Sequence, residues 1–456
     1  MSNTSTPCFS FFGDFQKAFA GLIRESSCQS LFSSHGPRGG GSPKLTAWQW
    51  LMARVYHAVA MTGSFATHVK QITDIDISDS ALSQRGQSIG WKLLAAVLGE
   101  VLRPMADAAL HPDAFYHGLR LLALDGTRFN LRNTDAINSK AVKARCNRGC
   151  GQPAFAHLLA VVLVELGLHQ PLAAALGWQG EGEITLARRL FTPQAIPAGS
   201  MLLGDRLFGS PWLLWELLPI LQAIGSACLM RVKSNIKVIR EKRLADGSWL
   251  VTIPVVDPAT RRQVGTIRVR EIFADLRIRK DGEAIRIRLW TSLLDAAAHP
   301  AMELVELYTS RWEQELFFRE LKSQLHGRNN LLDAQTPDTA AQEVLAMLLA
   351  ASLIASQRAA VAETAGVEVL RVSFGQVHEQ TVALCQVFEL GHDLIGPSQR
   401  AEWTSRLLAQ LAVTAIIPKR KPRSCQRALR QPVKDWPKMK IPTSTPLIKI
   451  ISISNP

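Results

Sequence analysis

The spacing of apolar positions divides the chain into helical and strand-rich regions. Residues 36–43 read GPRGGGSP, which predicts a flexible linker after a short leader, so residues 1–43 are set apart from the rest. From residue 44 to about residue 110, apolar residues recur three and four positions apart, as in amphipathic helices. Ser78 or Asp79 is a suitable N-cap for a helix carrying Leu82, Arg85 and Ile89. With an amphipathic segment at 63–72 this predicts a helix–turn–helix, which is either a DNA-reading unit or a packing unit.

Short apolar runs replace this pattern from residue 118 onward. Strands are expected at 120–124, 157–166, 171–177, 201–203 and 227–232, with a helix at 211–224. This alternation is typical of an α/β domain. Between 233 and 290 apolar and charged residues alternate, and Asp246-Gly247 and Asp281-Gly282 predict hairpin turns. A long helix is expected at 301–325, more helix to 365, and mixed sequence to about 415.

Composition narrows the class of protein. The 456 residues are 47% hydrophobic and 20% charged, enough to bury cores in roughly two to four units. A net charge of +14 predicts a polyanionic partner, nucleic acid first and an anionic membrane surface second. The membrane alternative is disfavoured, because the first 15 residues lack signal-peptide features and the apolar run at 344–354 is shorter than the roughly 20 residues of a span. We therefore expect a cytoplasmic protein with no membrane partner.

The basic C-terminal tail and the cysteines bear on DNA binding and on metal binding, respectively. Residues 419–440 contain nine Lys or Arg and one acidic residue, which predicts contact with phosphates, a solubilising extension being the alternative. Seven cysteines are spread along the chain. Only Cys146 and Cys150 are close in sequence, so reduced thiols are expected rather than a zinc site.

Two aspartates follow predicted strands, and a third acidic residue lies on the predicted helix at 301–325. Asp125 stands in LLALDGT and Asp205 in MLLGDRLF, where α/β folds often place sites, although a turn and a helix cap would also explain them. In YTSRWEQELFFRELKSQL, Tyr308, Arg311, Glu315 and Lys322 fall within about 60° of helical face. This face is either a solvated charged stripe or the source of a third metal ligand.

The motif Y-x2-R-x3-E-x6-K formed by these four residues resembles the signature of IS4-family DDE transposases. The neighbouring DGT, GDRLF, LMRVK and TSLLD also resemble that family, from about residue 82 to residue 322. Leu207 departs from it, because many relatives have a small residue there. The position of a base-stacking tryptophan in one relative aligns with Ile287, so Trp290 is carried only as a candidate DNA contact, with a core tryptophan as the alternative.

The resemblance implies an α/β, RNase H-like catalytic domain over 118–365 with a β-rich insertion at about 233–290. A helical DNA-binding domain at 44–117 would precede it, and a C-terminal helical region with the basic tail would occupy 366–456. Asp125, Asp205 and Glu315 would be the catalytic ligands of two Mg²⁺ ions, with Mn²⁺ as a substitute. Tyr308, Arg311 and Lys322 would contact DNA.

The implied activity is metal-dependent cut-and-paste transposition of an insertion sequence. End cleavage, through a hairpin, and strand transfer would act on terminal inverted repeats and target DNA. A homodimer on double-stranded DNA is expected, associated with the bacterial nucleoid in the cytoplasm. Two alternatives stay open, namely an RNase H-like nuclease and an inactive or repurposed DNA-binding derivative.

Overall fold

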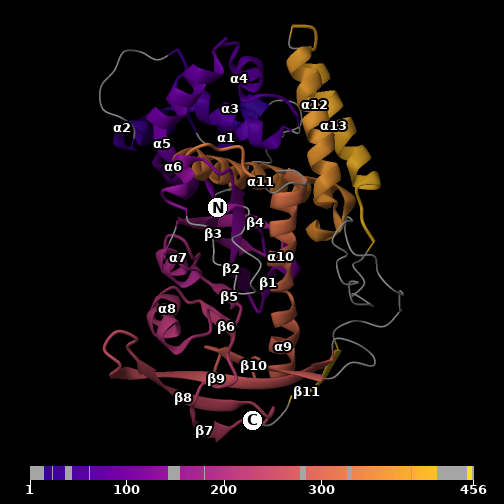
Figure 1. Cartoon of the computed structure of the whole chain (residues 1–456). Coiled ribbons are helices and arrows are strands. Elements are labelled where there is room, and N and C mark those ends of the chain that lie inside the picture. Colours follow the sequence, from indigo (N-terminus) through magenta and orange to yellow (C-terminus); the bar gives the residue numbers. More distant parts are fainter. Residues whose placement is uncertain are drawn as a thin grey trace, which may run out of the picture.

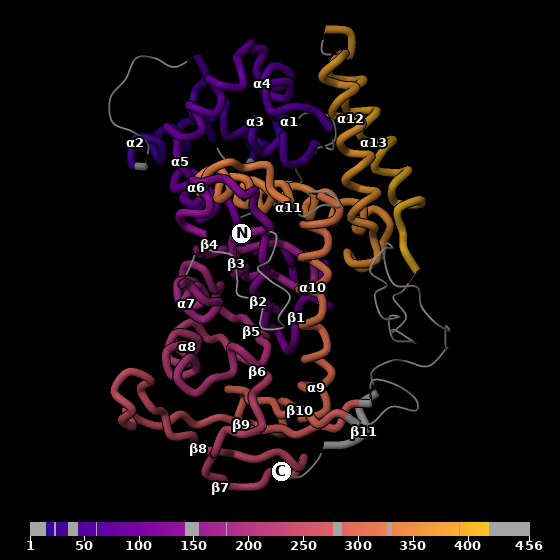
Figure 2. The backbone as a smooth tube through the Cα atoms, viewed as in Figure 1, coloured from indigo at the N-terminus to yellow at the C-terminus, as the bar shows by residue number. Residues whose placement is uncertain are grey.

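The structure is a computed structural model of the chain, shown in Figures 1 and 2. It describes residues 15–22, 24–35, 44–60, 62–141, 155–178, 180–277, 284–325, 331–391, 393–418 and 449–453. The linker at 36–43, the Asp281-Gly282 turn, the Cys146 and Cys150 pair and the basic tail at 419–440 lie outside the described residues.

Five helices form the N-terminal region: α1 (Phe15–Leu22), α2 (Glu25–His35), α3 (Ala47–Val59), α4 (Phe65–Thr73) and α5 (Asp79–Val101). Side-chain caps mark their starts. Thr46 and Gln49 form a capping box on α3, and Ser78 rather than Asp79 caps α5. Helix α5 is kinked at Gly90, whose φ of 70° is available mainly to glycine. The expected helices at 63–72 and after Ser78 are confirmed as α4 and α5.

One large mixed sheet runs through the molecule, in the order β4-β3-β2-β5-β6-β10-β9-β8-β7. Among the strand pairs of the described residues, only β2–β5 and β5–β6 are parallel. The strands on this path are β2 (Leu119–Leu131), β3 (Ala156–Glu165), β4 (Gln170–Gly177), β5 (Ser200–Gly204), β6 (Ala227–Arg231), β7 (Ile239–Arg243), β8 (Trp249–Val256), β9 (Gln263–Arg277) and β10 (Ala284–Thr291). Strand β1 (Phe115–Tyr116) pairs with β2, and β11 (Lys449–Ile453) pairs with β9.

The β-rich stretch after residue 233 extends this sheet instead of forming a separate one. Strand β10 pairs with β6 in an antiparallel register that includes Trp290 and Met230. The hairpin predicted at Asp246-Gly247 is confirmed, because it joins the antiparallel strands β7 and β8. Figure 1 shows this part of the sheet at the end of the molecule opposite the N-terminal helices.

Helices cover both faces of the central strands. In β2, Leu122 and Leu124 pack in one apolar cluster with α7 (Glu183–Arg189) and α8 (Pro211–Ala223). Leu121 and Ala123 belong to another cluster with α9 (Ala301–Thr309). This alternation directs Asp125 toward the α9 and α10 side and Gly126 toward the α7 side. Figure 1 shows α7 and α8 across the sheet from α9 and α10 (Trp312–Arg319).

The expectation of one regular helix over 301–325 is wrong in detail. Helix α9 ends at Thr309, α10 begins at Trp312, and a π-helix occupies Glu320–Leu325. The break is caused by a change in hydrogen bonding, because amides 310, 311, 313 and 314 donate to carbonyls three residues back. Such 3₁₀-type bonds tighten the helix locally.

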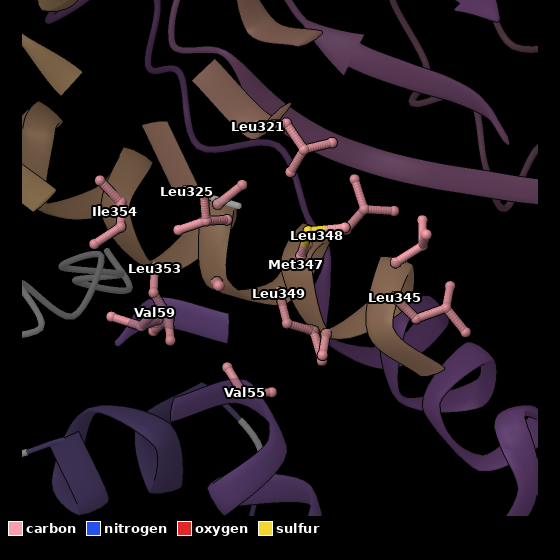
Figure 3. Close-up of a cluster of buried hydrophobic side chains, with 14 of the residues drawn as sticks. Val55, Val59, Leu321, Leu325, Leu345, Met347, Leu348, Leu349, Leu353 and Ile354 are labelled. Carbon is pink, nitrogen blue, oxygen red and sulfur yellow. The ribbon is translucent and has the colours of Figure 1, made fainter. Parts of the chain in front are cut away.

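Helix α11 (Pro337–Ala365) contributes many of the buried apolar residues of the core that it shares with the N-terminal helices. Figure 3 shows Leu345, Leu348 and Ile354 of α11 in a cluster with Val55 and Val59 of α3. By length and composition α11 could span a membrane, yet most of its apolar stretch is buried inside the protein. Helix α11 is therefore a core helix, and the interpretation of the apolar run at 344–354 as something other than a membrane span agrees with this burial.

The remaining helices are short or lie near the C-terminus. They are η1 (Pro112–Ala114), α6 (Asp135–Asn138), η3 (Val369–Arg371), α12 (Phe374–Leu390) and α13 (Pro397–Thr414). One continuous core joins α1 to α5 with α11, α12 and parts of β2 and β3. This core continues across residues 117 and 365, where domain boundaries were expected. The division into domains therefore stays a prediction.

Candidate active site

Asp125 and Asp205 meet at the edge of the parallel strands. Leu124 of β2 and Gly204 of β5 are register partners, and each is followed directly by one of the aspartates. Asp205 lies just after the end of β5, as expected. Asp125 does not lie at a strand end, because β2 continues to Leu131 and pairs with β3. That part of the prediction is corrected, while the proximity of the two acids remains.

The surroundings of Asp125 disfavour its negative charge. Burial raises the pKa of Asp125 to about 6, and the charges of Asp205 and Glu183 act in the same direction. The Gly126 amide, which donates to Oδ1 at 2.8 Å, and Arg311 oppose this rise. Asp205 accepts a hydrogen bond of 2.7 Å from the Leu207 amide. It does not cap the following helix, whose N-cap is Ser210. Half-buried acids close to one another favour the binding of a cation.

Arg311 lies between two of the predicted ligands. Its Nη1 is 3.6 Å from Asp125 Oδ2, and its Nη2 donates to Glu315 Oε1 at 3.0 Å. Burial alone would lower the pKa of Arg311, but Tyr308, Glu315 and Asp125 raise it. The guanidinium therefore carries a positive charge that partly neutralises both carboxylates. Arg311 thus links Glu315 to Asp125, although their two elements are far apart in sequence.

A residue that the sequence did not single out fixes α10 at this position. Gln314 is fully buried, and its Nε2 donates to the Val162 carbonyl at 3.1 Å. Val162 is the register partner of Asp125 in the β2–β3 pair. Gln314 therefore anchors the helix opposite Asp125, one residue before Glu315.

A buried polar network holds the other side of α10. His169 Nδ1 lies 2.6 Å from Glu320 Oε2, and its Nε2 lies 3.0 Å from Glu313 Oε2. Arg358 of α11 also contacts Glu320, at 3.4 Å. Burial alone would lower the pKa of His169, but the two glutamates raise it. None of these contacts has a signature in local sequence, because their members are up to 189 residues apart, from His169 to Arg358.

Tyr308 and Lys322 occupy the two ends of the motif. Tyr308 is half-buried, and burial raises its pKa to about 12. Lys322 lies in the π-helix, where its Nζ donates to the Arg128 carbonyl at 2.8 Å and sits 5.1 Å from the centre of the Phe129 ring. Burial lowers the pKa of Lys322 to about 8. The motif therefore lies along β2, with Arg311 and Glu315 near Asp125 and Lys322 farther along the strand.

Trp290 is a core residue in this structure. Its side chain is 1% exposed, and its indole N–H donates to Glu271 Oε1 at 2.9 Å. Ile287, the other position considered, is also buried. This burial favours the core alternative for Trp290, and a DNA contact at this residue stays a prediction.

The three acids fit a hard divalent cation by their chemistry. Mg²⁺ and Mn²⁺ prefer carboxylate oxygens, which Asp125, Asp205 and Glu315 supply. In the part of the chain that the structure describes, no three His, Cys, Asp or Glu side chains are arranged so that they could hold a metal ion as they stand. Arg311 instead contacts one oxygen of Asp125 and one oxygen of Glu315, so a cation would compete with the guanidinium for these two carboxylates.

The face of α5 that carries Leu82, Arg85 and Ile89 packs inside the protein. Leu82 and Ile89 are buried in the core, and Arg85 donates to the Leu45 carbonyl at 3.1 Å. The helix–turn–helix pattern was expected to be either a DNA-reading unit or a packing unit. The contacts of this face of α5 favour the packing unit.

The cysteines that the structure describes form no disulfide. Cys28, Cys228 and Cys385 are free and buried. Their state is consistent with the reduced thiols expected from the sequence.

Comparison with known proteins agrees with this site. A family model described as "Transposase DDE domain" matches residues 116–353, which include Asp125, Asp205 and Glu315. The transposase InsG of insertion sequence element IS4 from Escherichia coli (strain K12) is 27% identical over 290 residues. That match covers 63% of this chain and 62% of InsG, less than two thirds of the relative's length.

A solved structure also aligns, namely the cryo-EM structure of the piggyBac transposase synaptic complex with hairpin DNA. The alignment covers 91% of this chain and 85% of that chain, with 11% identity and a TM-score of 0.44, which is too low to support a conclusion. The family model, by contrast, covers more than half of the 456 residues, and this protein therefore belongs to the transposase DDE domain family.

Proposed function

We propose that the protein is a DNA transposase that cuts and rejoins DNA with divalent cations held by Asp125, Asp205 and Glu315. The observation that carries the proposal is the meeting of Glu315 with Asp125 through Arg311, within the region matched by the family model. The order β4-β3-β2-β5-β6, with its first three strands antiparallel and the next two parallel to β2, supports an RNase H-like core.

Asp125, Asp205 and Glu315 would hold the two cations, since Asp125 senses the charge of Asp205 and shares Arg311 with Glu315. Mg²⁺, with Mn²⁺ as a substitute, would supply an activated water or hydroxyl and stabilise the leaving oxygen. Arg311 has a planar fork that suits a phosphate as well as a carboxylate, so DNA would compete for the guanidinium now held by Asp125 and Glu315. Tyr308 and Lys322 would contact the DNA backbone.

The complete reaction follows from the resemblance to the IS4 group. It comprises cleavage at terminal inverted repeats, formation and reopening of a hairpin, and joining to target DNA in the cytoplasm, with a homodimer pairing two ends. Retention of all three acids disfavours an inactive derivative.

The test uses purified protein, Mg²⁺ and a plasmid that carries the gene with its native flanks. We expect wild-type protein to excise a linear fragment with hairpin ends. Glu315→Gln should abolish cleavage while end binding persists, because the substitution removes a ligand charge and leaves the fold intact. Glu306→Gln is the matched control, since Glu306 is exposed on the neighbouring helix α9.

Two outcomes would count against the proposal. Cleavage by Glu315→Gln at the wild-type rate would remove the carboxylate from the mechanism. Cutting without strand joining by the wild type would indicate a nuclease.

A further inference from the structure

A fourth carboxylate, that of Glu183, reaches the same edge of the sheet from the face opposite α10. Glu183 is the first residue of α7, and its side chain lies directly against Gly126, the residue after Asp125. A Cβ atom at position 126 would lie 2.5 Å from Glu183 Cδ and 2.9 Å from Glu183 Oε2. Gly126 lies inside β2 and is absent from the positive-φ glycines of the described chain, so backbone conformation does not require glycine here. Glycine is required at position 126 because the Glu183 carboxyl group occupies the space that a side chain would need.

The edge of the sheet is open at this point. Strand β5 ends at Gly204, so within the described residues β2 has no strand neighbour on the β5 side from Asp125 to Phe129. Carboxylates from the two faces can therefore approach one another around this edge. Glu183 and Asp205 are close enough for the charge of Asp205 to raise the pKa of Glu183, after the larger effect of burial and against a smaller opposing effect of Arg128.

Glu183 lacks the partners that usually neutralise a glutamate. Among the described residues no hydrogen bond or ion pair of its carboxylate is found, and the charge of Arg128 acts on it more weakly than burial and Asp205 do. Glu181, two residues earlier, accepts a hydrogen bond from the Trp178 amide at 2.9 Å and pairs with Arg189. A half-buried carboxylate without such a partner, next to two further acids, is unfavourable unless a cation balances it.

We propose that Glu183 is a fourth carboxylate ligand of the divalent-cation site, acting with Asp125 and Asp205. This inference rests on the proposed function and deepens it. Gly126 has a defined role in it, because only a residue without a side chain leaves room for the Glu183 carboxylate. A structural role at the start of α7 is the competing explanation, and it predicts no effect on cation affinity.

The test measures Mn²⁺ affinity of the full-length protein by electron paramagnetic resonance, with no DNA cleavage involved. We expect Glu183→Gln to weaken Mn²⁺ binding about tenfold or more, as loss of groups at metal sites typically does. Glu181→Gln is the matched control, since it makes the same change two residues away, and its affinity should equal that of the wild type. Circular dichroism would establish that each variant is folded.

A second variant tests the role of Gly126 independently. Gly126→Ala should fold normally, because the atoms in its way belong to the flexible end of a side chain, yet it should displace the Glu183 carboxylate. Its Mn²⁺ affinity should fall as in Glu183→Gln, and the double variant should bind little more weakly than either single one.

The outcomes separate this inference from the proposed function. If Asp205→Asn weakens Mn²⁺ binding and Glu183→Gln does not, the fourth ligand is refuted and the three-acid site stands. If Asp125→Asn and Asp205→Asn also bind as the wild type does, both proposals fail.

Discussion

At the scale of single residues, Lys322 combines a charge with an enclosed position. Its ammonium group has one carbonyl partner and an aromatic ring beside it, and burial lowers its pKa to about 8. The charge is therefore present at neutral pH and is lost as the pH rises through about 8, in the range where an ordinary lysine stays protonated.

We expect affinity for end DNA to fall between about pH 7 and pH 9, because the deprotonated amine no longer attracts phosphate. Lys322→Arg should remove this part of the pH dependence, since a guanidinium keeps its charge. Lys322→Met should bind weakly across the whole range. Fluorescence anisotropy at constant salt measures all three, and an identical pH dependence in wild type and Lys322→Arg would contradict the assignment.

Some candidate site residues could be predicted from the sequence and others could not, for a physical reason. Asp125 and Asp205 stood out because each follows a predicted apolar strand, and Glu315 because it belongs to a motif with fixed spacing. Gln314, Glu183 and His169 could not, because each acts through a contact with a distant segment. For Trp290 the sequence left a core position and a DNA contact open, because the choice depends on how β10 packs between β6 and β9.

At the scale of elements, α10 is held by interactions on its buried side. Gln314 ties it to β3, and His169 ties its two ends to the turn between β3 and β4. The strands and most helices could be predicted from apolar spacing. The break at 310–311 and the π-helix could not, because both change hydrogen bonding without changing the spacing of apolar residues.

The His169 contacts make stability depend on pH. A histidine with a raised pKa contributes stability that is complete below its unfolded value of about 6.5 and is lost as the pH rises through the folded value. We expect the free energy of unfolding to fall above about pH 6.5, by at most about 1.4 kcal/mol per pH unit for one proton.

The matched variant is His169→Asn, because residue 169 has a φ of 56° and asparagine tolerates this conformation. Its unfolding free energy, measured with denaturant, should vary less over the same pH range. Parallel curves for the two proteins would show that His169 does not couple to the glutamates.

At the scale of the whole molecule, positive charge is concentrated near the C-terminus. Residues 419–440 carry nine Lys or Arg and one Asp, a net charge of +8 out of +14. Strand β11, beyond this tail, pairs with β9, so deleting the C-terminus would also disturb the sheet. Charge removal by substitution is therefore a cleaner test than truncation.

Replacing the nine basic residues with glutamine should weaken DNA binding equally for all sequences. The slope of log affinity against log salt concentration should become shallower by about 0.9 for each phosphate that the tail no longer neutralises. Filter binding at several salt concentrations, with end DNA and unrelated DNA, measures both effects. A weakening confined to end DNA would make the tail a reader of sequence.

The position of α11 has a consequence for synthesis on the ribosome. Helices α3 and α5 emerge early, but the helix that covers their apolar faces is translated only after nearly the entire sheet. Until then these faces stay exposed to other nascent chains, a state that promotes aggregation. A product that ends before residue 337 lacks α11 and cannot complete this core, so we expect it to be unstable.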